Sequence, residues 1–172
     1  MYKNVFMPVL EVAFAENRLS HLLNNQIREH LFLFANILQQ ENNKCNLTAI
    51  KDTEGIIYKH FVDSLLVAEQ IPDGSNLIDI GCGAGFPSLP LAICRPDLKV
   101  TALDSVSKKI SFINKCISIL ELINVIPVCA RAEAAARTHC ATALMWQFPA
   151  RLPLSRYWLS SVFLLCALAG HF

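Results

Sequence analysis

Residues 79–87 read Asp-Ile-Gly-Cys-Gly-Ala-Gly-Phe-Pro, and this stretch decides the fold. A short β-branched run at residues 77–80 leads into the glycines, and an apolar segment at 86–94 with helical character follows them. A strand that enters a helix through G-x-G-x-G brings its backbone close to a ligand, because glycine has no Cβ. The stretch therefore predicts a ligand-binding strand–turn–helix unit centred on Gly81, Gly83 and Gly85.

The chain continues this alternation after the turn. Residues 99–103 form a second β-branched run, residues 107–122 carry apolar residues at helical spacing, and residues 124–129 form a third run. Strands and helices that alternate with short connections favour a parallel α/β sheet with right-handed crossovers.

Helices are expected before the sheet. Residues 26–40 place apolar side chains on one helical face, and residues 53–71 repeat the pattern until the turn-forming Pro-Asp-Gly-Ser at 72–75. A weaker helical pattern covers residues 13–24. We expect an N-terminal helical segment over 1–72, the first half of a Rossmann-like domain over 73–137 and a tail of different character over 138–172.

The glycine spacing discriminates between cofactors. A dinucleotide turn, G-x-G-x-x-G, needs its third glycine where Phe86 stands, which disfavours a nucleotide-dependent oxidoreductase. The spacing instead resembles motif I of S-adenosylmethionine-dependent methyltransferases; a glycine-rich turn that binds no ligand is the plainer alternative. Asp104 ends the second strand 23 residues after Gly81, close to the ~20 expected for a carboxylate that binds ribose hydroxyls. Asp104 could equally cap the following helix with Ser105 and Ser107.

Three further positions have plain structural interpretations. Glu133 follows the third strand, where it either lies near an adenine or is a solvated acid at a helix start. His60 lies in an apolar helical context, which is typical of a structural or surface histidine. Lys108 and Lys109 are expected on a solvated helix face, with a phosphate contact as the alternative.

Composition excludes several classes of protein. The chain has 172 residues, 53% hydrophobic and 17% charged, with a net charge of +1, which argues against a strong electrostatic funnel for nucleic acid. Seven scattered cysteines without a C-x-x-C pair suit neither a disulfide framework nor a zinc site, so we expect a cytoplasmic protein without a metal. The longest apolar run, residues 157–169, is shorter than the ~20 residues that span a bilayer, so we expect no membrane partner.

Four blocks of sequence together resemble one bacterial family. They are NLTAI at 46–50, KHFVDSL at 59–65, the stretch from 79 to 112 that holds the glycine turn and SKKISF, and Arg-Ala-Glu at 131–133. In order and spacing they closely resemble the RsmG family, also called glucose-inhibited division protein B, over about residues 19–137. The resemblance implies S-adenosylmethionine-dependent methylation of N7 of a guanine in small-subunit ribosomal RNA. It implies the RNA or the 30S subunit as partner and no particular oligomeric state.

The resemblance also implies site residues. Together with the glycines of the turn, the implied cofactor contacts are Gly81, Phe86, Asp104, Ser105, Val106, Ala132 and Glu133. Residues expected to shape the substrate site are Asn46, His60, Asp63 and Ser64. No catalytic acid or base is singled out, because guanine N7 already has a lone pair and positioning supplies most of the rate effect.

The last 39 residues differ from the rest of the chain. They contain no Asp, Glu or Lys and carry a net charge of +3, whereas residues 1–133 carry −2. Family members continue with a fourth strand of the type F-D-V-A-V-S-R-A-V-A, where this chain has ALMWQFPARLP at 143–153. One possible DNA sequence that encodes residues 143–153, when it is translated from its third base, yields this family strand.

We therefore expect an incomplete methyltransferase sheet, with one edge of its first strand unpaired and with weak or absent methyl transfer. A non-catalytic fragment that binds cofactor or ribosome is the alternative.

An out-of-frame tail makes a direct prediction about the gene. Resequencing should reveal a single-base shift near the codons for residues 138–144, since the Met and Trp codons of this segment force the Val and Ala of the family strand in the shifted frame. An unshifted gene over these codons contradicts the hypothesis.

Overall fold

The computed structural model describes residues 1–131, 143–145 and 164–168. The longer helices are α1 (Lys3–Glu16), α2 (Asn25–Cys45), α5 (Ser88–Cys94) and α6 (Ser107–Leu120). Short helical segments are η1 (Ser20–Leu22), α3 (Thr53–Ile56), the π-helical η2 (Ile57–Val62), α4 (Asp63–Leu65) and η3 (Ala68–Gln70). The strands are β1 (Asn76–Ile80), β2 (Lys99–Asp104), β3 (Val125–Cys129), β4 (Ala143–Met145) and β5 (Leu164–Leu168).

The strands form one sheet in the order β3-β2-β1-β5-β4. β1 pairs with β2 and β2 with β3, both in parallel, so the α/β fold with preceding helices that the sequence predicts is confirmed. The register sets Ile80 beside Leu103 and Leu103 beside Val128. These pairs align the carboxyl ends of the three parallel strands at one edge of the sheet.

The expectation of an unpaired edge on the first strand is wrong. β5 lies against β1 in antiparallel orientation, with Leu164 opposite Ile80, and β4 extends the sheet beyond β5. Backbone hydrogen bonding explains the pairing, since an apolar strand satisfies its own donors and acceptors by adding to a free edge. Most of the proposed out-of-frame tail lies outside the described residues.

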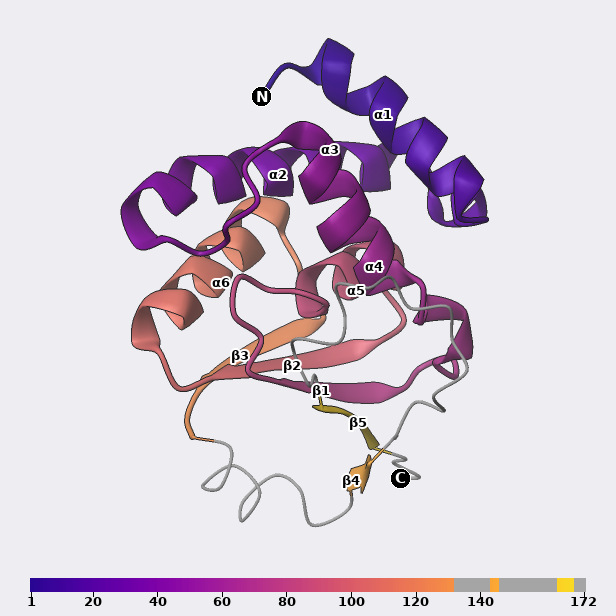
Figure 1. The fold of residues 1–172 in the computed structure, drawn as a ribbon. Helices are drawn as coiled ribbons and strands as arrows, with labels where there is room; N and C mark the ends of the chain where they lie inside the picture. Colours follow the sequence, from indigo (N-terminus) through magenta and orange to yellow (C-terminus); the bar gives the residue numbers. More distant parts are fainter. Residues whose placement is uncertain (132–142, 146–163, 169–172) are drawn as a thin grey trace.

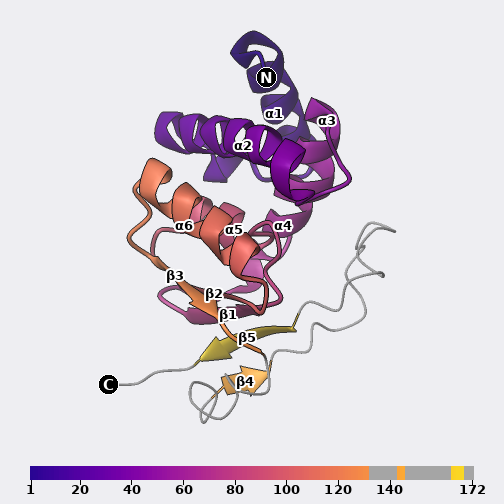
Figure 2. The ribbon, with the colours of Figure 1, turned by 90° about the vertical axis from the view of Figure 1, so that its left-hand side faces the viewer.

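The described helices all cover one face of the sheet. Figures 1 and 2 show α4, α5 and α6 directly above the parallel strands, with α2 and then α1 stacked further out. On the opposite side, a small second cluster holds the buried Ile78 and Leu103 with the partly buried Ile80, Val128 and Ala130. In the part of the chain that the structure describes, no helix combines the length and apolarity needed to cross a bilayer.

Aromatic rings join the two helical layers. Phe34 of α2 is fully buried, and its ring centroid lies 5.7 Å from that of Phe61, 5.3 Å from that of Phe86 and 6.5 Å from that of Phe112. These partners belong to η2, to the segment that follows the glycine turn and to α6. One side chain of α2 therefore contacts three separate parts of the fold.

The first helix differs from its prediction. The sequence indicates weak helix over 13–24, whereas α1 ends at Glu16 and η1 replaces the rest. The buried residues Phe6, Leu10, Ala13 and Phe14 of α1 follow i, i+4, i+7, i+8 spacing, so its core-facing stripe starts earlier than the predicted pattern. The helix predicted at 26–40 is confirmed and longer: Asn24 caps α2 by accepting the backbone N–H of Ile27 at 2.8 Å.

The aromatic core predicts that alanine substitutions at two neighbouring positions of α2 lower the free energy of unfolding by very different amounts. Phe34→Ala removes a fully buried ring and should lower the free energy of unfolding by about 3–5 kcal/mol. Leu33→Ala alters a side chain that is 40% exposed and should cost less than about 1 kcal/mol. Urea denaturation followed by circular dichroism measures both; equal losses contradict the central role of Phe34.

Candidate functional site

The glycine turn connects β1 to α5 with three residues in the left-handed region. Gly81, Gly83 and Gly85 have φ of 82°, 57° and 88°. The backbone N–H groups of Gly81 and Cys82 donate to the carbonyl of Leu103 at 2.7 and 3.0 Å, which fixes the turn against the end of β2. A Cβ at Gly85 would lie 2.6 Å from Leu89 and 2.9 Å from Ile113, so this glycine is also required by close packing.

Asp104 holds the ends of β1 and β2 together. Its side chain is almost fully buried and accepts the N–H of Gly83 on Oδ2 at 3.1 Å and that of Val106 on Oδ1 at 2.9 Å. The alternative role of Asp104, a cap of the following helix together with Ser105 and Ser107, is wrong, because α6 has no side-chain cap hydrogen bond and the Val106 bond of Asp104 lies one residue before the helix. The two carboxylate oxygens are the ones that the predicted ribose role requires.

A cavity of about 560 Å³ opens over these strand ends. Its volume lies within the range of small-molecule sites. It is lined by Ile80, Gly81, Leu103, Asp104, Ser105, Val106, Lys109, Ala130 and Arg131. The structure therefore gathers Gly81, Asp104, Ser105 and Val106 around one hollow, whereas Ala132 and Glu133 lie outside the described residues.

Lys109 corrects one expectation. Lys108 is exposed as predicted, but the ammonium of Lys109 lies 3.3 Å from Oδ2 of Asp104 and lines the cavity. Lys109 lies in the first turn of α6, directly after the strand that Asp104 ends. This position, a lysine in the helical turn that follows an acidic strand end, is the sequence signal that points to it. Arg131 lines the cavity without an equally clear signal.

His60 contacts the segment that follows the glycine turn. Its imidazole stacks on Phe86, with ring centroids 4.2 Å apart and planes 9° from parallel, and its Nε2 lies 2.8 Å from the hydroxyl of Thr48. Burial lowers the pKa of His60 to about 4, although a backbone hydrogen bond at Lys59 acts in the opposite direction. The ring is therefore neutral at physiological pH, and it links the NLTAI and KHFVDSL blocks to the turn.

The other substrate-site candidates occupy different environments. Ser64 is buried and its hydroxyl donates to the carbonyl of His60 at 2.5 Å. Asp63 is buried at the start of α4. Asn46 is exposed and ends α2 in the left-handed conformation, with φ of 47°. The structure thus brings Ser64 to His60 and gives Asn46 a helix-ending position.

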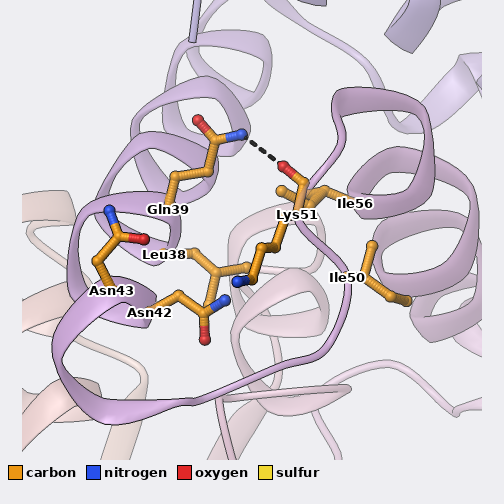
Figure 3. A pocket seen from close by; sticks show the side chains of 7 residues that line it. All are labelled: Leu38, Gln39, Asn42, Asn43, Ile50, Lys51 and Ile56. Atoms are coloured by element: carbon orange, nitrogen blue, oxygen red, sulfur yellow. Dashed lines mark hydrogen bonds between the residues drawn. The ribbon is translucent and has the colours of Figure 1, made fainter.

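A buried amide anchors the loop that carries Thr48. Asn42 donates to the carbonyl of Thr48 and accepts its N–H, both at 2.8 Å. Next to this anchor, Leu38, Gln39, Asn43, Ile50, Lys51 and Ile56 complete the lining of a smaller cavity of about 170 Å³. Figure 3 shows the Gln39 amide reaching across it to the carbonyl of Lys51, 3.0 Å away. These contacts fix the position from which Thr48 meets His60.

Asp79 lies below the turn, fully buried within β1. Its Oδ2 accepts both the N–H and the hydroxyl of Ser88, and its Oδ1 has no hydrogen-bond partner among the described residues. Burial raises the pKa of Asp79 to about 7, against the lowering effect of the Ser88 bonds. Asp79 thus joins the turn to the start of α5.

The buried imidazole predicts a pH-dependent stability. Between pH 6.5 and 4 the unfolded state protonates His60 while the folded state does not, so this group's contribution to stability falls as pH falls. Asp79 acts oppositely, because its folded-state pKa is raised. His60→Gln should therefore gain stability relative to wild type, on the order of 1 kcal/mol, between pH 7 and 5.

Urea denaturation at several pH values isolates this effect. His21→Gln, at an exposed histidine whose Nε2 lies 3.3 Å from Glu69, serves as the control for removal of a surface imidazole. Parallel curves for wild type and His60→Gln contradict the assignment of a neutral, buried imidazole.

Curated relatives match about two thirds of the chain. The small-subunit ribosomal RNA methyltransferase G of Clostridium beijerinckii is 45% identical over 117 residues, which are 67% of this chain and 49% of the relative. That of Acetivibrio thermocellus is 45% identical over 112 residues, 64% and 46% of the two chains. That of Roseiflexus sp. is 50% identical over 101 residues, 58% and 43% of the two chains. The chain spans about half the length of these relatives.

One solved structure and one family model also match this chain. A coclaurine N-methyltransferase bound to N-methylheliamine and SAH is 19% identical, with a TM-score of 0.41, over 76% of this chain and 44% of its own. Residues 27–146 match the family model described as rRNA small subunit methyltransferase G. Because this match covers well over half of the chain, the chain belongs to the rRNA small subunit methyltransferase G family, as the four blocks of sequence predict.

Proposed function

We propose that this chain binds S-adenosylmethionine over the glycine turn and that its family activity is methylation of guanine N7 in small-subunit ribosomal RNA. The observation that carries the proposal is Asp104, a buried carboxylate that lines a cavity directly beside the turn. A carboxylate in this position offers two oxygens to the two hydroxyls of a ribose.

The residues of the cavity fit an adenosyl ligand. A Cβ built on Gly81, which lines the cavity, would meet nothing within 4 Å, so its backbone borders open space. Val106 is 44% exposed and presents an apolar side chain to the same cavity. The cavity therefore offers backbone to the methionine part of the ligand, a carboxylate to its ribose and an apolar side chain to its adenine.

Each residue has a proposed task. Asp104 accepts the ribose hydroxyls, Gly81, Gly83 and Gly85 keep the turn open, and Ser105 and Val106 border the adenine. Phe86 is a proposed cofactor contact from the resemblance, and its ring also packs against His60 and Phe34. Ala132 and Glu133, which lie outside the described residues, enter the proposal from the resemblance alone.

The methyl group passes in line from the sulfonium to the lone pair on guanine N7, with S-adenosylhomocysteine as leaving group. Because N7 needs no deprotonation, the chain has to orient the guanine and exclude water rather than supply a base. His60 suits this task, since it is neutral, stacked and held by Thr48. We propose that His60, Asp63 and Ser64 shape the guanine site, with Asn46 shaping the loop beside it.

The proposed substrate is small-subunit ribosomal RNA or the 30S subunit, in the cytoplasm. We further propose that the 172-residue chain transfers methyl groups weakly or not at all. The antiparallel β5 supports this, because a doubly wound sheet binds its ligand where parallel strands diverge on both sides of the first strand. The alternative function, a non-catalytic fragment that binds cofactor or ribosome, is favoured by the same strand together with the intact turn.

Cofactor binding has a direct test in Asp104→Asn. Loss of the charged acceptor should weaken S-adenosylhomocysteine binding by about 10- to 100-fold, as measured by isothermal titration calorimetry. Asp73→Asn changes a side chain that is 99% exposed and should bind as wild type does. Circular dichroism confirms that both variants fold; unchanged affinity in folded Asp104→Asn contradicts the ribose assignment.

The same preparations separate the two functions. Wild-type chain is incubated with S-adenosylmethionine carrying a labelled methyl group and with 30S subunits that lack the N7 methyl group. Binding of S-adenosylhomocysteine with no transferred label is the expected result. Stoichiometric labelling of the RNA contradicts the proposed loss of activity.

A further inference from the structure

Asp104 has almost no acceptor capacity left. A carboxylate offers about four lone-pair positions, two on each oxygen. Oδ2 accepts from the N–H of Gly83 at 3.1 Å and from the ammonium of Lys109 at 3.3 Å, and Oδ1 accepts from the N–H of Val106 at 2.9 Å. Donors from the described residues thus occupy three of the four positions and leave one on Oδ1.

A ribose diol needs one position on each oxygen. Bidentate binding to Asp104 therefore requires one donor to leave Oδ2. Gly83 N–H belongs to a turn that is fixed by the backbone bonds of Gly81 and Cys82 to Leu103, so it cannot leave without disrupting β1 and β2. Lys109 is the donor that can move, because its side chain is 39% exposed and rotates about four bonds.

The position of Lys109 favours this movement. Lys109 lies in the first turn of α6, where the helix dipole repels a cation, and the Asp104 carboxylate offsets that repulsion. A pair with one partner this exposed is worth little in water, so a second donor readily replaces it. Lys109 and Asp104 line the same cavity, so a ribose hydroxyl bound there lies close to both side chains.

We propose that Lys109 and the ribose diol compete for Oδ2 of Asp104, so that Lys109 sets how tightly the cavity holds adenosyl ligands. This inference rests on the proposed function above and extends it to a residue that tunes affinity. Lys109 stabilises the buried carboxylate of Asp104 in the absence of ligand. When the ribose hydroxyl replaces it, the free energy of the Lys109–Asp104 interaction is lost, and the adenosyl ligand binds more weakly by that amount.

Lys109→Met tests the competition, since methionine keeps the length of the side chain and removes the donor. The variant should bind S-adenosylhomocysteine about two- to fivefold more tightly than wild type in calorimetry. Without added ligand its melting temperature should be lower, because a nearly buried carboxylate loses its ion-pair partner. Lys108→Met, one residue away and exposed, is the matched control and should bind as wild type.

A ligand without the diol distinguishes competition from general charge effects. The 2′,3′-dideoxy analogue of S-adenosylhomocysteine should bind wild type and Lys109→Met equally. Lys109→Leu, which also lacks a donor, provides a second variant in case Lys109→Met does not fold, and Lys109→Arg, which keeps the charge, should resemble wild type.

The outcomes are distinct for the two proposals. Equal or weaker binding of S-adenosylhomocysteine by the folded Lys109 variants that lack a donor, with wild type still binding, overturns the competition and leaves the cofactor site intact. Tightening of the dideoxy analogue by the same factor also overturns it. Failure of wild type to bind S-adenosylhomocysteine overturns the proposed function and the competition together.

Discussion

The packing of Phe86 is the constraint on which the arrangement of this chain depends. Its ring contacts the imidazole of His60 and the ring of Phe34, directly after the three glycines of the turn. Because those two neighbours come from η2 and α2, the N-terminal helices take part in holding the turn, in addition to its backbone bonds to Leu103. The ring of Phe86 thus joins the helical layer to the segment that follows the glycines.

Local patterns made the centre of the fold predictable. The alternation of β-branched runs with helical spacing over residues 77–129 defines the parallel strands, because each element is short and ends in strong turn chemistry. The spacing of Gly81 and Asp104 placed both at one edge, since carboxyl ends of parallel strands align. Periodicity alone could not predict the antiparallel β5. Its pairing with β1 joins two segments that are far apart in the chain and depends on the free edge of β1, which the local pattern of neither segment reveals.

Long-range contacts explain the rest. His60 reads as an ordinary histidine in its own helix, and only the folded chain shows its ring against Phe86 and its Nε2 beside Thr48. Lys109 reads as part of a charged helix face, whereas the turn from β2 into α6 brings its ammonium within 3.3 Å of the carboxylate five residues earlier. Both residues acquire their chemistry from neighbours that sequence periodicity does not reveal, whereas the family resemblance had already pointed to His60.

The π-helical turn of η2 has a consequence for how this fold tolerates change. A π-helix closes its hydrogen bonds over five residues rather than four, so it accommodates one residue more than an α-helix of equal length. Adjacent side chains then diverge less around the axis, which allows both His60 and Phe61 to reach Phe86. Deletion of one residue here would return the segment to ordinary α-helical winding, with the residues after it kept in register, and would remove the wide turn that carries His60 and Phe61. The extra residue of η2 thus matters for the contact with Phe86 rather than for the continuation of the helix.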